Sequence, residues 1–527
     1  MSDRTPLVPA LLLAISAAAL AAFFVAFDGD WFPLGIPDEW IWPTPDVWSE
    51  ATAEWVLFLP AAIAVALLIG WATWAATWID GCPRRRFVGA IAVCIALASV
   101  FQFFCEVATP GGLQKWAILH SYSANGFHAA ARHYGNDLPH LLKDHAEIIR
   151  DLDPHHFSAN PPGWVVVYAS TMKFYTEHPR LARFVWDLAP RELPWRLRRM
   201  SGTIGVPLNE QAALATIAAL SRLLCFAGAI PAAWLAAARA GRKAALAVAS
   251  VVLLLPVEPL FAPRCDTVYP AVALLVLALS HAAWERRWWP AAALAGIVLG
   301  VGTFFSTCFF IIGGLAAAYI IGQSLTGKRP TVASVCAAPL GWLAVVAAIY
   351  FAGHNSWSTW SVNFAKNVEF NQQYRQSYGA WTLVNLLEFG AALGLPLVVF
   401  LAGRVAVLRR ADPLLCVWLA MLAFLDLAGT NRGEACRLWL FMMPIGALLA
   451  VEWLPSLGRW FRLSLAALLA LQALNCVVLD RDLMLFTDLE QTKARQESGL
   501  SKIQRTKGGM VHPSVPAAEL IEKDGHR

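Results

Sequence analysis

Three short polar motifs, far apart in the chain, hold residue types that could do chemistry. They are the turn His155-His156-Phe157-Ser158-Ala159-Asn160-Pro161-Pro162-Gly163, the Pro263–Tyr269 junction and the Gly429–Trp439 segment. A guanidinium group binds phosphate oxygens through paired hydrogen bonds, so Arg264, Arg432 and Arg437 are candidates to bind a phosphate or diphosphate group. Four further polar residues complete the predicted binding set: Asp266, Glu434, His155 and Asn160.

The same arginines have a second interpretation, as members of structural ion pairs. Glu434 and Arg437 are three residues apart in the sequence, so on a helix they share one face. Arg264 and Asp266 are close neighbours with the same ambiguity. Both interpretations remain open at the level of the sequence.

Acid–base chemistry requires a carboxylate or an imidazole that accepts a proton near neutral pH. We favour Glu106, Asp153 and His156 for this catalytic role. The weaker alternatives are Asp151, His155, Asp38 and Glu39. A histidine in such a turn is more often an ordinary polar surface residue, and a Pro-Pro-Gly turn is also a common way to begin a helix.

Helices that cross a lipid bilayer must position these motifs. Of the 527 residues, 58% are hydrophobic and 15% are charged, whereas soluble domains have about 25% charged residues. The sequence therefore predicts an all-α, polytopic membrane helix bundle with about thirteen transmembrane helices. The predicted spans are Leu7–Phe27, Glu54–Trp78, Phe87–Cys105, Ala212–Ala238, Ala244–Phe261, Val268–Trp284, Trp289–Phe304, Ser306–Ile321, Val332–Ala352, Thr382–Arg404, Pro413–Leu427, Cys436–Val451 and Leu463–Leu479.

Basic residues in short loops indicate which side of the membrane each loop faces, because such loops stay in the cytoplasm. Alternate connectors hold Arg84–Arg86, Arg239–Lys243, Arg286–Arg287 and Arg409–Arg410. We therefore expect a multi-pass protein of the plasma (inner) membrane, with a cytoplasmic N-terminus and an extracytoplasmic C-terminus. All three polar motifs then lie on the extracytoplasmic side. The net charge of +5 is small and gives no reason to expect nucleic-acid binding.

We expect three parts along the chain. Residues 1–86 form two N-terminal transmembrane helices with an acidic outer loop, residues 87–479 form the main membrane module, and residues 480–527 form a polar tail. The main module includes a large helical extracytoplasmic loop, residues 106–210. Within that loop, the apolar stretch Gly163–Thr176 is too short for an ordinary crossing, which favours an interfacial or re-entrant helix.

Arg222 lies deep inside the predicted span Ala212–Ala238. A charge at that depth needs a partner within the bundle, and Glu388 and Asp426 are the nearest acids in type. The ten cysteines fall mostly in apolar stretches without a C-x-x-C pair. No cluster has the spacing of metal ligands, so we expect no metal site and no cofactor.

The stretch His354–Trp381 mixes tryptophan, asparagine, glutamine and tyrosine side chains. Aromatic faces beside amides and hydroxyls suit a sugar ring. An amphipathic helix on the outer surface would have the same composition, so both interpretations stay open.

In their order along the chain, the motifs resemble those of the membrane glycosyltransferases of the GT-C superfamily. The first motif follows Ser121-Tyr122-Ser123-Ala124-Asn125-Gly126-Phe127-His128-Ala129-Ala130, Asp266 lies at a junction where the superfamily often has an aspartate, and Gly433–Trp439 is similar to a Gly-Glu-x-x-Arg-x-Trp element of bacterial members. The resemblance covers roughly Phe87–Val451. It implies a GT-C-like catalytic module, a polyprenyl-phosphate-linked sugar donor, an extracytoplasmic glycan, lipid or protein acceptor, and inversion at the anomeric carbon.

The chain departs from the superfamily where members usually place an aspartate, often with a second acid. Here Ser123, Ala124 and Asn125 stand instead, and a neutral amide does not accept a proton, so a base must come from elsewhere. We expect a membrane glycosyltransferase that uses a lipid-linked sugar. The alternatives are a polytopic transporter or lipid flippase built around Arg222, and a catalytically altered relative that binds a lipid carrier.

Overall fold

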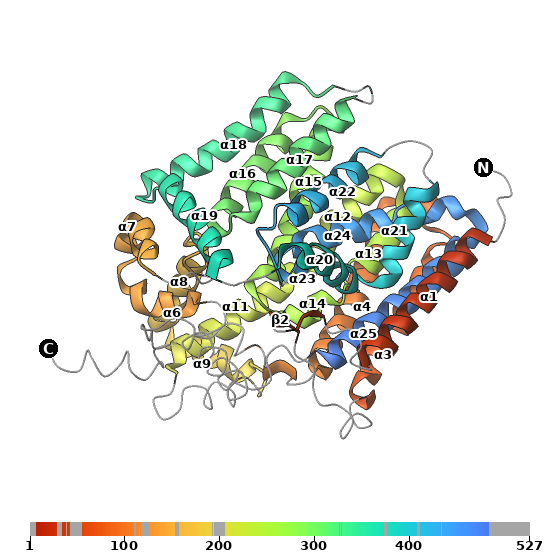
Figure 1. Ribbon diagram of the computed structural model, residues 1–527, viewed down its shortest axis with the longest axis horizontal. Coiled ribbons are helices and arrows are strands. Elements are labelled where there is room, and N and C mark those ends of the chain that lie inside the picture. Colours follow the sequence, from red (N-terminus) through yellow and green to blue (C-terminus); the bar gives the residue numbers. More distant parts are fainter. Residues whose placement is uncertain are drawn as a thin grey trace.

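The computed structural model is an all-α bundle with one small hairpin (Figure 1). The structure describes residues 7–28, 34–37, 39–42, 55–109, 112–114, 116, 126–152, 157–191, 193, 206–325, 327, 329–373, 377–407, 412–433 and 435–483. Within these residues, the prediction of a polytopic membrane helix bundle is confirmed, because several helices are long and apolar enough to cross a membrane.

Helices from both ends of the chain pack against each other. α1 (Leu7–Asp28) and α3 (Leu59–Ala75) both contact α25 (Phe461–Asp482), and α3 also contacts α4 (Arg84–Ala108). α1, α3 and α25 form the right-hand edge of Figure 1. The short 3-10 helices η2 (Trp55–Phe58) and η3 (Ile79–Gly81) flank α3. Strands β1 (Gly35–Ile36) and β2 (Trp40–Ile41) pair antiparallel in the loop after α1.

Several short helices follow α4, and most of them gather at the opposite edge of Figure 1. They are η4 (Gly112–Gln114), α6 (Phe127–Tyr134), η5 (Gly135–Asp137), α7 (Leu138–Arg150), α8 (Gly163–Glu177) and α9 (Pro179–Leu188). The described part of the predicted outer loop is therefore helical. α8 is 15 residues long and is not among the described helices that could cross a membrane.

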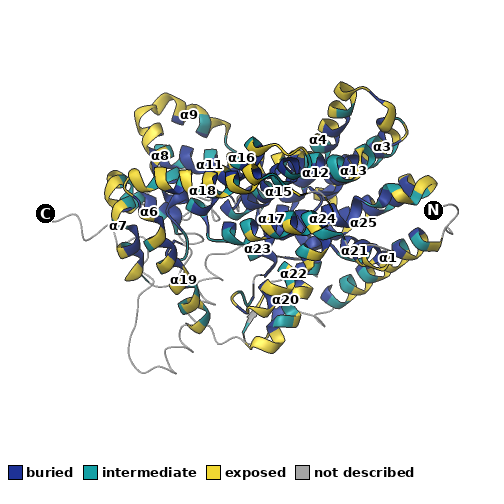
Figure 2. Ribbon diagram, turned by 90° about the horizontal axis from the view of Figure 1, so that it is seen from above, coloured by how far each residue is buried: buried dark blue, intermediate teal, exposed yellow. Residues whose placement is uncertain are grey.

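The remaining elements form the body of the bundle. They are α11 (Leu208–Ala227), α12 (Ala229–Ala240), α13 (Arg242–Val251), α14 (Val257–Phe261), η6 (Cys265–Val268), α15 (Tyr269–Glu285), α16 (Trp289–Phe305), α17 (Cys308–Leu325), α18 (Val332–Phe351), α19 (Ser356–Gln373), α20 (Tyr378–Leu393), α21 (Leu395–Val407), α22 (Pro413–Leu427), α23 (Ala435–Leu438), η7 (Leu440–Met442), α24 (Met443–Val451) and η8 (Leu454–Trp460). Every residue of α24 is buried, and α24 lies in the middle of the bundle in Figure 2. A helix that is apolar on all sides belongs in such a position.

Length and composition give eight described helices that could cross a membrane, or nine if one bent pair is a single span. The predicted count of about thirteen is not confirmed. The predicted span Ala244–Phe261 is broken into α13 and the short α14, with Pro256 between them. The predicted span Thr382–Arg404 is bent by 104° where α20 meets α21, at Gly394 with φ 103°.

Among the described helices, α16 and α18 pack very closely through glycines. A Cβ atom placed on Gly296 would lie 1.9 Å from the Ala338 carbonyl oxygen, and one on Gly341 would lie 2.3 Å from that of Ala293. Small residues allow the backbones of membrane helices to approach this closely, and dispersion contacts then hold the pair together.

Because Gly296 has no room for a methyl group, we expect Gly296→Ala to lower the free energy of unfolding by about 1–3 kcal/mol, the usual cost of overpacking. Gly70→Ala on α3 is the matched control, because nothing lies within 4 Å of a Cβ atom at that position. The midpoint of thermal unfolding in detergent measures both. Equal midpoints for the two variants would contradict the proposed packing.

Candidate functional site

The Pro-Pro-Gly turn and the Asp266 junction lie next to each other. Trp164, at the start of α8, donates a hydrogen bond from Nε1 to the Tyr269 hydroxyl at 3.0 Å. One turn further along α8, the Tyr168 hydroxyl lies 3.9 Å from the Cys265 thiol. Gly163, directly before Trp164, lies against the end of α16, because a Cβ atom there would lie 2.6 Å from the Phe304 carbonyl oxygen. The first two motifs of the sequence therefore meet.

Arg264 and Asp266 form an ion pair at this junction. Arg264 Nε lies 3.2 Å from Asp266 Oδ2, and the side chains are 5% and 22% exposed. The carboxylate is thus the more accessible partner. This geometry agrees with the structural interpretation of the pair. It also places the buried guanidinium group of Arg264 against a carboxylate that is partly exposed to solvent.

A stripe of asparagines on α19 connects the Pro-Pro-Gly turn to the third motif. Asn363 donates to the carbonyl oxygen of Ser158 at 2.9 Å and Asn367 to that of Ala159 at 3.4 Å. Asn371 donates to the carbonyl oxygen of Thr430 at 2.5 Å. The three amides recur every fourth residue, so they lie along one face of the helix. At a rise of about 1.5 Å per residue, α19 holds the two motifs about 12 Å apart.

The third motif is a loop held by α20. The Tyr378 hydroxyl donates to the Leu427 carbonyl oxygen at 2.6 Å, and Asn385 donates to the Asn431 carbonyl oxygen at 2.9 Å. Gly429 has φ 60°, a left-handed conformation that favours glycine, and a Cβ atom there would meet the Tyr378 ring at 2.5 Å. The guanidinium of Arg432 lies over the same ring, 5.3 Å from its centroid.

Arg437 follows on the short helix α23 and is buried. α23 packs against α20 and also against α14, which directly precedes Arg264 in the chain. The helix that carries Arg437 therefore lies in the same part of the bundle as the Asp266 junction.

The hairpin of the first loop reaches the third motif. Glu39 Oε2 accepts hydrogen bonds from the backbone N–H of Ser377 at 2.9 Å and from Trp381 Nε1 at 2.6 Å, at the start of α20. Slight burial acts to raise the pKa of Glu39, but these hydrogen bonds and the charge of Arg432 outweigh it and lower the pKa below its usual value. Glu39 therefore stays ionised beside Arg432, as an anion at a helix N-terminus does.

Glu106 forms a buried ion pair with Arg222. Glu106 Oε2 lies 2.9 Å from Arg222 Nε, and the side chains are 0% and 4% exposed. Trp116 Nε1 donates to the other carboxylate oxygen at 2.5 Å. The prediction that Arg222 pairs with Glu388 or Asp426 is wrong, because those acids lie on α20 and α22 whereas α11 meets the end of α4. A carboxylate engaged on both oxygens is better suited to holding a charge in place than to taking a proton from a ligand.

Two more buried groups extend this cluster. Cys225, one helical turn after Arg222, donates its thiol hydrogen to Glu258. Glu258 and Cys225 are 3% and 4% exposed. The sequence gives only a weak signal for this contact, because Glu258 lies near the end of an apolar stretch where long polar side chains usually reach water.

A second ion-pair group, not predicted from the sequence, joins α6 to α11. His128 Nε2 lies 3.3 Å from Glu210 Oε2, and Arg132 Nε lies 3.4 Å from Glu210 Oε1. His128 and Arg132 are four residues apart, a spacing that places both on one face of a helix. That spacing was the signal available in the sequence. The two contacts with Glu210 anchor α6 to α11.

A further network lies at the other end of the bundle, near the arginine-rich connectors. Arg239 contacts Asp412 at 2.7 Å and Glu452 at 2.8 Å, and Arg404 contacts Glu452 at 2.8 Å and also Asp412. The four groups line a cleft of about 470 Å³ together with His281. Two cations and two anions satisfy one another here, which makes the network a structural clamp between α12, α21, α22 and α24.

The predicted catalytic and binding residues are divided between described and undescribed parts of the chain. Asp153, His155, His156 and Glu434 lie outside the described residues, as does position 38. Asn160 is half-buried in the Pro-Pro-Gly turn, and Asp151 is exposed at the end of α7. The described members of the predicted binding set are Asn160, Arg264, Asp266, Arg432 and Arg437. Their elements contact one another directly or are connected through α14, α19 and α20.

The asparagine stripe can be tested without a substrate. Asn363→Leu removes the amide that donates to the buried Ser158 carbonyl, and a buried carbonyl left without its donor costs about 1–3 kcal/mol. We expect a lower midpoint of thermal unfolding for this variant than for Gln372→Leu, which changes an exposed residue of the same helix. Equal unfolding midpoints for Asn363→Leu and Gln372→Leu would contradict a structural role for the asparagine stripe.

The contact between α7 and the start of α19 should depend on pH. Burial, reinforced by the nearby His354, lowers the pKa of His145 to about 3. The unfolded chain takes up a proton near the ordinary value of about 6.5 and the folded chain does not, so stability is complete above pH 6.5 and falls by about 1.4 kcal/mol per pH unit below it. We expect His145→Leu to flatten the decline in unfolding midpoint between pH 7 and pH 5. The exposed His133→Leu should retain the wild-type profile, and a His145→Leu profile as steep as wild type would contradict this assignment.

Comparison with known proteins does not add to this description. A scan against protein-family models finds no match, and a search of curated proteins finds no significant match. The resemblance to the GT-C superfamily rests on the three short motifs and their order in the sequence.

Proposed function

We propose that the chain is a membrane glycosyltransferase that moves a sugar from a polyprenyl-phosphate donor to an extracytoplasmic acceptor. The observation that carries the proposal is the arrangement of the three motifs. The Trp164–Tyr269 hydrogen bond joins the turn to the Asp266 junction, and the asparagines of α19 join the turn to the Thr430 loop. A reaction between a lipid-linked donor and a separate acceptor needs such a meeting point of distant segments.

In this proposal the arginines bind the phosphate of the donor. Arg432 lies in the loop beside Tyr378, while Arg264 and Arg437 are buried, and α23, which carries Arg437, contacts α14 just before Arg264. Fixed guanidinium groups in a site of low dielectric stabilise the negative charge that develops on a leaving phosphate. Asp266, half-exposed beside Arg264, would orient that cation toward the phosphate.

The chemical step follows from the superfamily resemblance. A hydroxyl oxygen of the acceptor attacks the anomeric carbon, the bond from that carbon to the phosphate oxygen breaks, and the polyprenyl phosphate leaves with the bonding electrons. The hydroxyl proton passes to a protein base, for which we retain Asp153 and His156. We give Glu106 a positioning role, because both of its oxygens are engaged by Arg222 and Trp116.

One observation favours the rival function of a transporter or lipid flippase. The Glu106–Arg222 pair is buried between α4 and α11, which are both long and apolar enough to span a membrane. Intramembrane ion pairs of this kind also occur on translocation pathways. A catalytically altered relative that only binds the lipid carrier would share the arginines and lack the transfer.

Purified protein in proteoliposomes, supplied with a radiolabelled polyprenyl-phosphate sugar and a glycan acceptor, tests the proposal. We expect Arg437→Ala to reduce transfer by at least about 100-fold, as loss of a charge-stabilising donor does. Arg437→Lys should retain part of the activity because it keeps the positive charge, and the exposed Arg286→Ala should match wild type.

Normal product yield from a correctly inserted Arg437→Ala variant would remove the phosphate-binding role. Lipid or solute movement across the vesicle membrane without any transfer, unaffected by Arg264→Ala, would favour the transporter. If the wild-type protein binds the donor and transfers no sugar, the result favours the catalytically altered relative that only binds the lipid carrier.

A further inference from the structure

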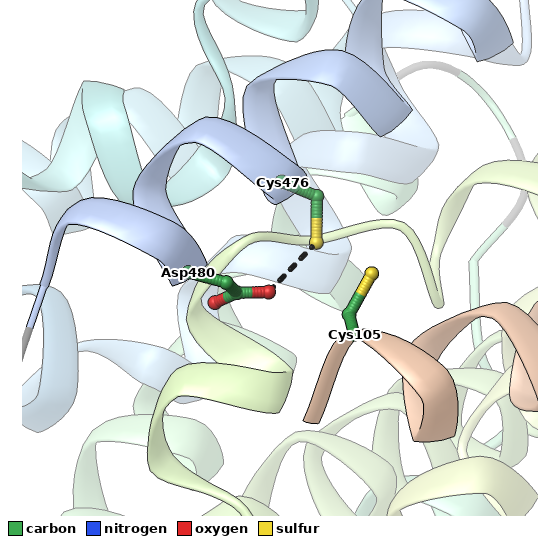
Figure 3. A group of neighbouring side chains, drawn as sticks. All are labelled: Cys105, Cys476 and Asp480. Carbon is green, nitrogen blue, oxygen red and sulfur yellow. Dashed lines mark hydrogen bonds between the residues drawn. The ribbon is translucent and has the colours of Figure 1, made fainter. Parts of the chain in front are cut away.

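Three potential metal ligands from opposite ends of the chain point toward one another (Figure 3). Cys105 lies in the last turn of α4, and Cys476 and Asp480 lie in the last two turns of α25. Their ligand atoms all lie within 4.8 Å of one another, and each of the three residues is 0% exposed. The sequence could not reveal this group, because the residues have no common spacing.

The distances within the group fit a tetrahedral cation. With Zn–S bonds of about 2.3 Å and a Zn–O bond of about 2.0 Å, a tetrahedral zinc site has sulfur–oxygen separations of about 3.5 Å and sulfur–sulfur separations of about 3.8 Å. The Cys476 sulfur lies 3.4 Å from Asp480 Oδ2. Cys476 and Asp480 are four residues apart on one helix, a spacing that lets both face the same ion.

We propose that Cys105, Cys476 and Asp480 bind a zinc ion. The two cysteines bind as thiolates and the aspartate through one carboxylate oxygen, and each thiol releases its proton to solvent as the ion enters. A buried carboxylate needs positive charge or several donors to offset its desolvation, and a divalent cation supplies that charge. This inference stands apart from the proposed transferase activity.

Gln102 is the candidate for the fourth ligand of the zinc ion. It lies three residues before Cys105 on α4, so it shares that face of the helix. Its side chain is 0% exposed, and neither of its amide atoms has a hydrogen-bond partner among the described residues. The Gln102 carbonyl oxygen, or a water held by it, would complete a tetrahedral set.

A disulfide between Cys105 and Cys476 is the competing chemistry for the same two thiols. Its formation would remove the hydrogen that Cys476 donates to the buried carboxylate of Asp480, leaving that group with less compensation. A cation, in contrast, would bind all three groups. In either form the ends of α4 and α25 are tied together immediately beside Glu106, so the site would also fix the position of the Glu106–Arg222 pair.

Zinc content of the full-length protein, purified in detergent under reducing conditions and incubated with Zn²⁺, tests the proposal. We expect about one zinc per chain for wild type, and a loss of roughly tenfold or more for Cys105→Ser and Asp480→Asn. Cys94→Ser, which alters another fully buried cysteine of α4, should retain the metal. X-ray absorption of wild type should show two sulfurs at about 2.3 Å from zinc, a measurement that does not depend on how well any variant folds.

Wild-type protein that is folded and holds no zinc would overturn the proposal. So would a first shell without sulfur, or recovery of a Cys105–Cys476 disulfide from non-reduced protein in stoichiometric amount. Equal zinc loss in Cys94→Ser and Cys105→Ser would also contradict this assignment. Transfer activity does not enter any of these outcomes, so failure here and failure of the transferase proposal are distinguishable.

Discussion

The region between α4 and α11 depends on one constraint: a charge buried between membrane helices must be neutralised within the protein. Glu106 is at the end of α4, where the chain leaves the bundle, and Arg222 is on α11, where the chain has returned. Their ion pair therefore closes the base of the predicted loop 106–210. Removing one partner of a buried pair typically costs about 3–5 kcal/mol, because the other charge is left uncompensated. The His128–Glu210 contact closes the same loop a second time, from α6 to the first turn of α11.

Charged side chains are arranged differently at the two ends of the bundle. At the end near the arginine-rich connectors, Arg239, Arg404, Asp412 and Glu452 neutralise one another within one network. At the other end the charges are distributed over separate pairs on several elements, with Asp266 half-exposed and Arg432 in a loop. A closed network resists change, whereas separate pairs on loops can exchange a protein partner for an anionic ligand at smaller cost. This difference makes the second end the better place for a ligand that carries a phosphate.

The sequence predicted strongly apolar helices well and pairings between distant helices poorly. Periodic, uninterrupted stretches such as Leu7–Phe27 and Val332–Ala352 are helices close to their predicted bounds. The predicted single span Ala244–Phe261 was wrong, and the sequence contains the reason. Pro256 lacks a backbone N–H donor, so a helix ends before it. The Glu106–Arg222 pair and the Cys105–Cys476–Asp480 group had no such signal, because side-chain contacts between remote helices depend on how those helices pack and rotate. The motifs of the candidate site were found from residue type alone, and their meeting through α19 was not.

α19 shows which side chains of the stretch His354–Trp381 are already engaged within the protein. Trp357 and Trp360 pack against each other and against Trp342 on α18, with ring centroids 5.2–5.9 Å apart. The amide hydrogens of Asn363, Asn367 and Asn371 are donated to backbone carbonyls. The amide donors are therefore engaged within the protein, and so is the buried Trp360 ring, whereas Trp357 is 59% exposed. The engaged groups serve as a support, and the sugar-ring interpretation of the stretch stays a prediction. The hydrogen bonds from α19 fix the backbone of the turn and of the Thr430 loop, so the position of these two motifs relative to each other depends on this one helix.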